Sequence, residues 1–314
     1  MYTVGIDLGG TNIVCGVVDE QYTIVAKAKC RTDLPRPAED IVADMEKTVR
    51  EAVANAGLTM DDIASVGVGC PGTCNLETGV VEYSNNLKFE NLPLRDMLKS
   101  RLNKEVYIEN DANAAALGEA LAGAARGAKS CVCITLGTGV GGGIIIDGKI
   151  YSGFNFAGAE LGHTVIVVDG EACTCGRRGC WEAYASATAL IRQTRTAMAK
   201  HPESLLWKLA GSFENVNGRT AFDAMRAGDP VGQQVVDTYI RYIGCGLVNM
   251  INIFQPEVLC IGGGICNEGE TLLAPLREYI AAERYSRHSV RQTKLCRAML
   301  GNDAGVIGAA SLKA

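Results

Sequence analysis

Hydrophobic and polar positions alternate along the first thirty residues, and this alternation predicts a meander of strands. Between Pro37 and Asn55 the apolar spacing changes to every third or fourth residue, which predicts a helix with Gly57 just past its end. An alanine-rich segment over 111–125 predicts a second helix. The strands predicted in this part cover residues 3–9, 13–18, 22–30, 64–69 and 106–109. The chain therefore opens as a β-meander followed by α/β units.

Similar patterns begin again after residue 130. The elements predicted there are strands at 130–136, 141–146 and 257–261, helices through most of 181–254 with one over 182–199, and a last helix at 303–312. We therefore expect an α/β fold with two domains. Residues 1–117 would form a small domain on which a helix within 301–314 packs back, and residues 118–300 would form a larger one.

A strand, a glycine turn and a second strand occur together twice, as IDLGGTNIVCGVV and ITLGTGVGGGIII. Glycine lets backbone N–H groups approach an anion closely, and each turn adds a threonine hydroxyl. The residues of the turns are Gly9, Gly10, Thr11, Gly137, Thr138 and Gly139. Two ordinary hairpin turns are the other interpretation. Repetition in matching contexts favours two sites for phosphate groups of one ligand.

Two familiar nucleotide motifs are excluded by context. Residues 137–142 satisfy GxGxxG, but a dinucleotide site needs a helix to follow, and here a strand pattern follows. The sequence contains no GxxxxGK[ST] motif.

Asp7 ends the first predicted strand beside a glycine turn. A carboxylate in this position can hold a hydrated Mg²⁺ against phosphates. The alternative is that Asp7 stabilises the turn by hydrogen bonds.

Asn110 and Asp111 stand where a buried strand meets the alanine-rich helix. Asp111 could serve as the N-cap of that helix, which its position favours. It could also accept a proton from a substrate hydroxyl that attacks a phosphate. Its place between the two predicted domains supports the second interpretation.

Three cysteines and a histidine lie within eighteen residues, and they are His163, Cys173, Cys175 and Cys180. Three thiolates and one imidazole complete a tetrahedral zinc shell without a position for water, which is typical of a structural site. Glu160 and Glu182 flank the cluster and could bind the hydroxyls of a ligand. His163 could bind zinc, the ligand, or both through its two ring nitrogens.

Composition narrows the class of protein. With 47% hydrophobic and 21% charged residues, the chain of 314 residues is of the soluble globular type. A net charge of −5 without basic runs argues against nucleic acid, and no apolar stretch is long enough to cross a membrane. The first residues enter a strand pattern directly, so we expect no leader peptide. Thirteen cysteines, several in apolar strands, fit a reducing cytoplasm.

These motifs together resemble the ROK (repressor, ORF, kinase) family of sugar kinases, and among them the bacterial glucokinases. The resemblance covers essentially the whole chain. Its segments are GIDLGGTN at 5–12, CPG at 70–72, ENDANAAALGE at 109–119, LGTGVGGG at 136–143, GAELGH at 158–163 and CTCGRRGCWEAYAS at 173–186. The last contains the CxCGxxGCxE motif, which is the most specific of them.

The resemblance implies a two-lobed, actin-like (ribonuclease H-like) ATPase fold with a structural zinc loop, closing on ATP and a hexose. Asp111 would be the base. The hexose would be bound by Gly72, Asn86, Asn110, Asp111, Glu160, His163 and Glu182. ATP and Mg²⁺ would lie along Asp7, Gly9, Gly10, Thr11, Asn12, Gly137, Thr138, Gly139 and Gly263. Zinc would be held by His163, Cys173, Cys175 and Cys180. Many members have lysine in place of Asn12, so a direct cationic contact there is absent.

The expected activity is phosphorylation of glucose to glucose 6-phosphate by ATP in a cytoplasmic homodimer. Other hexoses, namely N-acetylglucosamine, N-acetylmannosamine, fructose and allose, are the alternative substrates, because Phe154–Phe156 departs from the usual glucokinase sequence. Repressors of the same family carry a helix-turn-helix domain in front. Since Asp7 stands so near the first residue, we expect no such domain.

Overall fold

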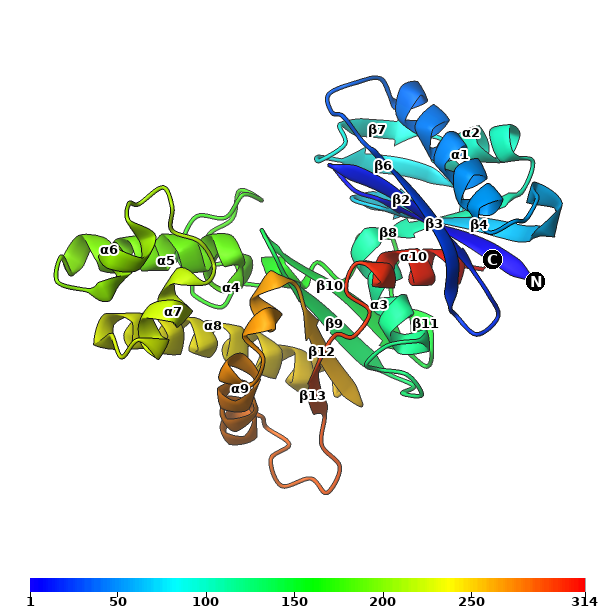
Figure 1. Cartoon of the computed structure of the whole chain (residues 1–314). Helices are drawn as coiled ribbons and strands as arrows, with labels where there is room; N and C mark the ends of the chain where they lie inside the picture. The colour runs from blue at the N-terminus through cyan, green and yellow to red at the C-terminus, as the bar shows by residue number, and fades with distance from the viewer. Residues whose placement is uncertain (314) are drawn as a thin grey trace. The chain divides into compact units, whose positions relative to one another are not determined.

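The computed structural model describes residues 1–313, which form two compact units (Figure 1). Unit 1 comprises Met1–Cys133, Gly143–Ala159 and the segment from Ala298 onward, and unit 2 comprises Ile134–Gly142 and Glu160–Arg297. We expected a single boundary after residue 117, whereas each unit is built from more than one segment of the chain. One reason is that α3 (Asp111–Leu121), which the boundary would cut, packs closely on α10 (Asp303–Ala310) within unit 1.

The sheet of unit 1 contains the predicted meander at one edge. Its strands, in spatial order, are β3 (Ile24–Arg31), β2 (Asn12–Val18), β1 (Tyr2–Leu8), β4 (Ile63–Cys70) and β8 (Glu105–Asn110). The first three pair antiparallel, whereas β1, β4 and β8 run parallel. The carboxyl ends of the three parallel strands therefore meet at one edge of the sheet, where ligands bind in open α/β sheets.

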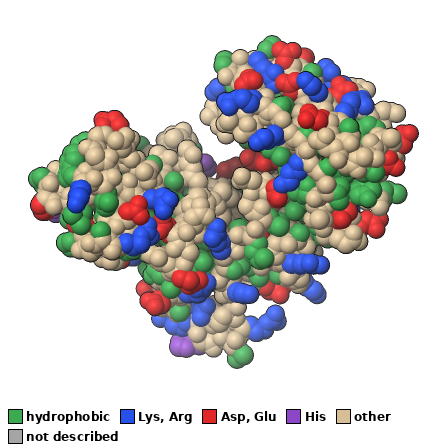
Figure 2. All heavy atoms as spheres, in the orientation of Figure 1, with side chains coloured by type: hydrophobic (Ala, Val, Ile, Leu, Met, Phe, Trp, Pro, Cys, Tyr) green, Lys and Arg blue, Asp and Glu red, His purple; other side chains and the backbone are tan. Residues whose placement is uncertain are grey.

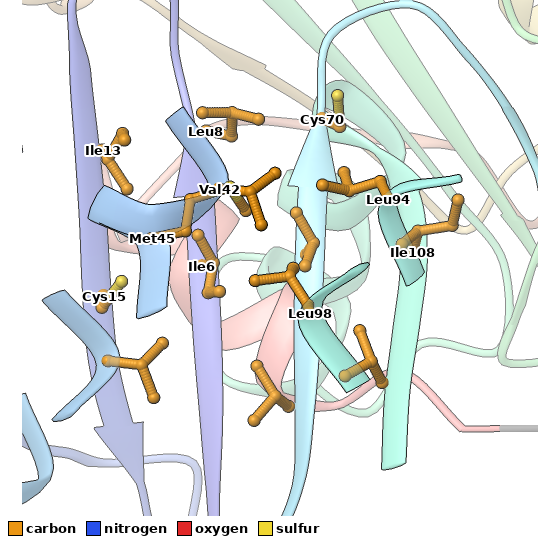
Figure 3. Packing of buried hydrophobic residues seen from close by; sticks show 14 of the residues in the cluster. Ile6, Leu8, Ile13, Cys15, Val42, Met45, Cys70, Leu94, Leu98 and Ile108 are labelled. Carbon is orange, nitrogen blue, oxygen red and sulfur yellow. The ribbon is translucent and has the colours of Figure 1, made fainter. Parts of the chain in front are cut away.

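The two faces of this sheet are covered differently because side chains alternate along each strand. One face packs on α1 (Ala38–Asn55) and α2 (Leu94–Leu102), and Figure 3 shows their side chains converging on Ile6 and Leu8 of β1. On the other face α10 approaches so closely that a Cβ at Gly5 would lie 1.9 Å from the carbonyl oxygen of Val306. Only glycine fits there, and this contact seats the C-terminal helix on the sheet.

Unit 1 also contains a small antiparallel sheet that the sequence patterns did not predict. It consists of β5 (Thr73–Asn75), β6 (Val80–Ser84) and β7 (Phe89–Leu92). Gly72, which precedes it, has φ +112°, and a Cβ there would lie 2.1 Å from the carbonyl oxygen of Tyr83. The sheet therefore fixes the path of the chain just after β4.

The second sheet has the spatial order β11 (Lys149–Ile150), β10 (Val140–Ile146), β9 (Cys131–Leu136), β12 (Val258–Gly262) and β13 (Lys294–Arg297). The helices of unit 2 are α4 (Glu182–Ala185), α5 (Ala187–Lys200), α6 (Leu205–Ala210), α7 (Thr220–Arg226), α8 (Pro230–Phe254) and α9 (Glu270–Glu283). Single 3₁₀ turns lie at Met60–Asp62, Leu161–His163 and Gly264–Glu268.

Two predicted helices were too long. The helix expected over 182–199 is broken at Ser186, whose extended backbone ends α4 and whose hydroxyl caps α5 through the amide of Ala189. The helix expected over 111–125 ends at Leu121, and the Glu119 carboxylate accepts a hydrogen bond from the amide of Ala124 just beyond it. Side-chain bonds to the backbone end both helices.

None of the helices within residues 1–313 combines the length and apolar character needed to cross a membrane. None of the cysteines within residues 1–313 forms a disulfide. On the face drawn in Figure 2, Lys and Arg side chains are interspersed with Asp and Glu side chains.

Candidate active site

Unit 1 brings two carboxylates together at the carboxyl edge of its parallel strands. Asp7 lies in β1 opposite Gly69 of β4, and Gly69 lies opposite Glu109, two residues before Asp111. Asp111 is the first residue of α3. Because β1, β4 and β8 are parallel and in register, the fold places Asp7 and Asp111 near each other although they lie 104 positions apart in the sequence.

The N-cap of α3 is Asn110, so the interpretation of Asp111 as the cap is wrong. The Asn110 side-chain oxygen accepts hydrogen bonds from the amides of Ala112 at 2.9 Å and Asn113 at 3.2 Å. Its amide nitrogen donates to the carbonyl of Gly72 at 3.1 Å. Asn110 therefore performs the structural work at this helix end. Asp111 accepts a hydrogen bond from the amide of Ala112 at 2.9 Å, and its own backbone amide also favours the ionised carboxylate.

The electrostatics of this pair are unfavourable in the absence of a ligand. Burial, and then the charge of Asp111, raise the pKa of Asp7 to about 6. Burial also raises the pKa of Asp111 above its usual range, partly offset by its bond with Ala112. Carboxyl groups with raised pKa values in such a position are typical of sites that hold a cation or move a proton.

Asp7 does not stabilise the glycine turn. Among residues 1–313 no hydrogen bond reaches its carboxylate, and the turn is closed instead by the amide of Gly9, which donates to the carbonyl of Asn12 at 2.9 Å. The hydroxyl of Thr32 donates to the carbonyl of Gly9 at 2.6 Å and secures the turn from the side. The Asp7 carboxylate is left available for a cation. Oxygen donors that repel one another in this way suit Mg²⁺.

Glu109 is a residue of this site that the sequence patterns did not reveal. Its side chain is only 2% exposed, and its pKa is raised by burial. One oxygen accepts from the amide of Asn110 at 2.8 Å and from the side chain of Asn113 at 3.1 Å, and the other accepts from the hydroxyl of Ser152 at 3.0 Å. Glu109 thus joins the end of β8 to the loop after β11. The ENDAN segment contained it, but nothing in one sequence separated it from an ordinary strand residue.

Two other predicted residues of unit 1 differ in their surroundings. Gly72 lies at the turn that the Asn110 amide holds, so the pair forms one rigid corner next to Asp111. Asn86 is exposed in the segment between β6 and β7. Asn12 and Thr11 are also exposed, at the start of β2 and just before it.

The glycine turn of unit 2 is held by a carboxylate. One oxygen of Glu182 accepts a hydrogen bond from the amide of Val140 at 3.0 Å. A Cβ at Gly139 would lie 2.3 Å from that oxygen, so the approach depends on glycine. The hydroxyl of Thr188 donates to the carbonyl of Thr138 at 2.8 Å. A further glycine, Gly263, has φ +93° and passes close to Leu136.

The four predicted zinc ligands lie together. Their ligand atoms are all within 4.8 Å of one another, with 3.6 Å between the sulfurs of Cys175 and Cys180 and 3.6 Å between the Cys173 sulfur and Nδ1 of His163. Tetrahedral zinc with bonds of about 2.3 Å to sulfur and 2.0 Å to nitrogen would set these separations at about 3.8 and 3.5 Å. The arrangement therefore fits a zinc ion.

The cluster also orients two polar side chains. Because Nδ1 of His163 faces Cys173, its other nitrogen is free of the cluster and lies 4.0 Å from the carboxylate of Glu160. The second oxygen of Glu182 accepts from the Thr174 hydroxyl at 3.4 Å and lies 3.7 Å from the Cys173 sulfur. Within unit 2, a histidine nitrogen and two carboxylates are thereby fixed around one loop.

The whole chain matches known proteins. Residues 3–314 match the model of the ROK family. A glucokinase of Thermotoga maritima is 40% identical over 310 residues, which are 98% of this chain and 96% of that protein. A ROK family glucokinase from Streptomyces griseus, solved in complex with glucose and AMPPNP, has a TM-score of 0.78 at 38% identity and covers 99% of this chain and 98% of its own.

A ROK hexokinase from Thermus thermophilus has a TM-score of 0.80 at 34% identity, over 99% of this chain and 97% of its own. These matches agree with the fold and the motifs that the sequence predicted. They extend over the glycine turns, the Asp111 segment and the cysteine loop alike. The chain belongs to the ROK family.

Proposed function

We propose that this protein is an ATP-dependent hexose kinase whose substrate is glucose. The observation that carries the proposal is the pair of carboxylates in unit 1, both with a raised pKa, of which Asp7 meets no hydrogen-bond donor among residues 1–313 and Asp111 is held by backbone amides at the start of α3. The likeness to glucokinases over nearly the whole chain supports the choice of reaction and substrate. A pair of acidic groups beside a glycine turn meets the two needs of phosphoryl transfer, which are a base and a place for a cation.

Asp111 is the general base in this proposal. Its carboxylate accepts the proton of the 6-hydroxyl of glucose while that hydroxyl oxygen forms a bond to the γ-phosphorus of ATP. The bond between that phosphorus and the oxygen bridging to the β-phosphate breaks, and ADP leaves with the electron pair. The raised pKa of Asp111 brings its basicity closer to the working pH, which favours proton transfer.

Asp7 and the glycine turns bind the cation and the phosphates of ATP in this proposal. When bound, Mg²⁺ would neutralise charge on the β- and γ-phosphates, and Asp7 would hold it. The amides of Gly9–Thr11 in unit 1 and Gly137–Gly139 in unit 2 would donate to phosphate oxygens, with Gly263 giving the backbone close access to the nucleotide. No lysine stands at position 12, so backbone donors and the cation carry this task.

Unit 2 supplies the binding surface for the sugar. We assign Glu160, His163 and Glu182 to hydroxyls of the hexose, together with Asn110, Gly72 and Asn86 of unit 1. Zinc would have a structural task, because three cysteines and a histidine fill its shell and leave no place for a reacting water. It keeps His163 and Glu182 in fixed positions.

A coupled assay of ADP release tests the proposal. The protein is mixed with ATP, Mg²⁺ and each of glucose, N-acetylglucosamine, N-acetylmannosamine, fructose and allose. We expect the highest kcat/KM with glucose. Preference for another hexose by more than tenfold would correct the substrate, and no activity with any sugar would overturn the kinase.

We also propose that the enzyme works in the cytoplasm as a homodimer. Cysteines that form no disulfide within residues 1–313 suit a reducing compartment. The homodimer rests on the family resemblance alone, and light scattering at several protein concentrations would test it.

A further inference from the structure

A polar cavity lies within unit 2, away from the residues assigned to glucose and ATP. Its volume is about 410 Å³, within the range of small-molecule sites. It lies between α5 and α8, which run side by side in Figure 1, and it reaches α4 and the zinc loop. The lining residues are Glu171, Tyr184, Arg192, Gln193, Thr196, Ala197, Lys200, His201, Gln234, Val235, Thr238 and Tyr242.

The chemistry of this lining is unusual for the space between two packed helices. Such faces are normally apolar. Here α5 presents Arg192, Gln193, Thr196 and Lys200, four positions that recur at helical spacing. The charged groups that line the cavity are Arg192, Lys200 and Glu171, which sum to +1 with His201 neutral, in a chain of net charge −5. Arg192 already lies 4.0 Å from the carboxylate of Glu171, so the +1 charge is that of Lys200, for which no ion pair is found within residues 1–313. An anion in the cavity would be attracted chiefly by Lys200.

One polar atom at this place has no partner. The side-chain oxygen of Gln193 is buried, and no hydrogen-bond donor meets it among residues 1–313. Leaving a buried acceptor in that state costs about 1–3 kcal/mol, so such atoms call for a donor. The side-chain nitrogen of Gln193 is already used, since it donates to the carbonyl of Tyr184 at 2.9 Å. Because the oxygen lies beneath the surface of the cavity, a ligand hydroxyl would reach it once the neighbouring side chains move apart.

Aromatic side chains supply the third component. The rings of Tyr184 and Tyr242 lie 4.6 Å apart at an angle of 44°. Rings of this kind offer apolar faces to the C–H groups of a sugar, and hydroxyl groups at their edge. The hydroxyl oxygen of Tyr184 already accepts from the amide of Glu171 at 2.7 Å.

From these features we propose that the cavity between α5 and α8 is a second, regulatory site for a phosphate monoester of a polyhydroxylated compound, the class to which a hexose 6-phosphate product belongs. Lys200 and Arg192 would hold the phosphate, Gln193 would accept from a hydroxyl, and the tyrosine pair would cover the carbon skeleton. Its identification with the product rests on the proposed function.

The site is connected to the glucose-binding residues through α4. Arg192 donates to the carbonyl of Ala183 at 2.7 Å, and Gln193 donates to that of Tyr184. These two bonds hold the short helix that begins with Glu182. A ligand that draws Arg192 and Gln193 toward itself would shift Glu182, and we expect it to change the KM for glucose more than kcat.

The test uses calorimetry with the active site already filled. Glucose 6-phosphate is titrated into the protein in saturating glucose, AMPPNP and Mg²⁺, and inorganic phosphate is titrated in parallel. We expect one ester per chain with a Kd below about 1 mM, and at least tenfold weaker binding of inorganic phosphate, which lacks the hydroxyls and carbons. Each tenfold difference corresponds to about 1.4 kcal/mol.

Lys200→Glu tests the phosphate contact directly. Lys200 is exposed, so we expect the variant protein to fold normally. We expect it to weaken the ester at least tenfold, whereas Lys208→Glu on neighbouring α6, an exposed lysine outside the cavity, should bind as the unchanged protein does. No binding in the filled protein, or equal binding by both variants, would overturn the site. Since this titration needs no turnover, a failed kinase assay and a failed binding test remain separate results.

Discussion

The two glycine turns of this protein have nearly the same sequence but different neighbours. In unit 1 the turn follows Asp7, a carboxylate that no donor reaches among residues 1–313 and whose pKa is raised to about 6 by burial and by Asp111. In unit 2 the turn is held by Glu182, whose oxygens accept from the amide of Val140 and from the zinc loop. One carboxylate is left unsatisfied, and the other accepts a hydrogen bond at each of its oxygens.

The number of hydrogen-bond donors around each carboxylate decides whether it can take up a proton or cation or is held rigidly in place. A carboxylate without donors stays ready to take a proton or a cation, at a cost in stability. A carboxylate bonded on both oxygens is fixed in position and makes a rigid contact. The same strand–turn–strand unit thus has a carboxylate without a hydrogen-bond donor beside it in unit 1, among residues 1–313, and a firmly held carboxylate beside it in unit 2. Each prediction below changes one side of this contrast.

The largest effect is expected at Asp111. Asp111→Asn keeps the shape of the side chain but removes the base, so turnover should fall by about a thousandfold, since general bases contribute 10²–10⁴. The Kd for glucose, measured by calorimetry, should stay within about tenfold. Asp61→Asn, at an exposed aspartate in the same unit, is the control and should be fully active. Turnover within tenfold of the unchanged protein would remove Asp111 from the role of base.

Loss of zinc should affect unit 2 and leave the base intact. Cys175→Ser removes an exposed ligand without opening a cavity, so metal analysis should find less than one zinc per chain. Because binding free energy at such sites is also folding free energy, thermal unfolding should shift down by several degrees. The KM for glucose should rise more than kcat falls. Cys245→Ser, at a cysteine of α8 outside the cluster, should keep its zinc, and undiminished zinc in Cys175→Ser would contradict the ligand assignment.

At Asp7 we expect stability and activity to change in opposite directions. The folded protein holds the Asp7 proton up to about pH 6, whereas the unfolded chain releases it near pH 3.8. Folded molecules therefore bind more protons between these values, and stability falls as pH rises through this window. Asp7→Asn removes the buried charge.

The Asp7→Asn protein, without metal or nucleotide, should unfold with a free energy higher by roughly 1–3 kcal/mol at pH 8, and the gain should vanish near pH 4. Denaturant titrations at the two pH values measure it. The same variant should lose most of its kinase activity. If the variant is less stable than the unchanged protein at pH 8, then the charge of Asp7 does not destabilise the folded protein.

The sequence was informative wherever a short motif determines the backbone. The meander, the buried strands after it and the cysteine cluster were predicted from residue patterns alone, because strand periodicity and ligand spacing are local properties. The pairing of Asp7 with Asp111 was not predicted, since it depends on the parallel register of β1, β4 and β8, which joins segments far apart in the chain.

Other features lay beyond any local pattern. Nothing in the sequence told Asn110 from Asp111 as the cap of α3, because both are good N-cap residues and the choice depends on the end of β8. The split between α4 and α5 depends on Ser186, a residue that helices also tolerate in their interior. The three bonds of Glu109 come from residues that the fold brings together, one of them 43 positions away.

The smallest predicted effect concerns the hydrogen bonds of Glu109, a carboxylate of unit 1 that differs from Asp7 in having donors. Unlike Asp7, the Glu109 carboxylate is buried but fully bonded, so it should stabilise the end of β8 and act on catalysis only by positioning Asn110 and Asp111. Ser152→Ala removes one donor at 3.0 Å and should lower the unfolding free energy by about 1 kcal/mol, while kcat changes by less than about tenfold. Ser100→Ala, at an exposed serine of α2, is the matched control.

The pH dependence of this loss distinguishes positioning by charge from simple packing. Burial raises the pKa of Glu109, whereas the Ser152 hydroxyl lowers it by favouring the ionised carboxylate. Removing the hydroxyl should therefore raise that pKa further, and the loss of stability should be larger at pH 8 than at pH 4, because the hydroxyl stabilises the ionised carboxylate. Denaturant titrations of the variant and the unchanged protein at both pH values measure the difference. An equal loss of unfolding free energy at both pH values would mean that Ser152 contributes by packing alone. The stabilisation by Glu109 would then not depend on the charge of its carboxylate.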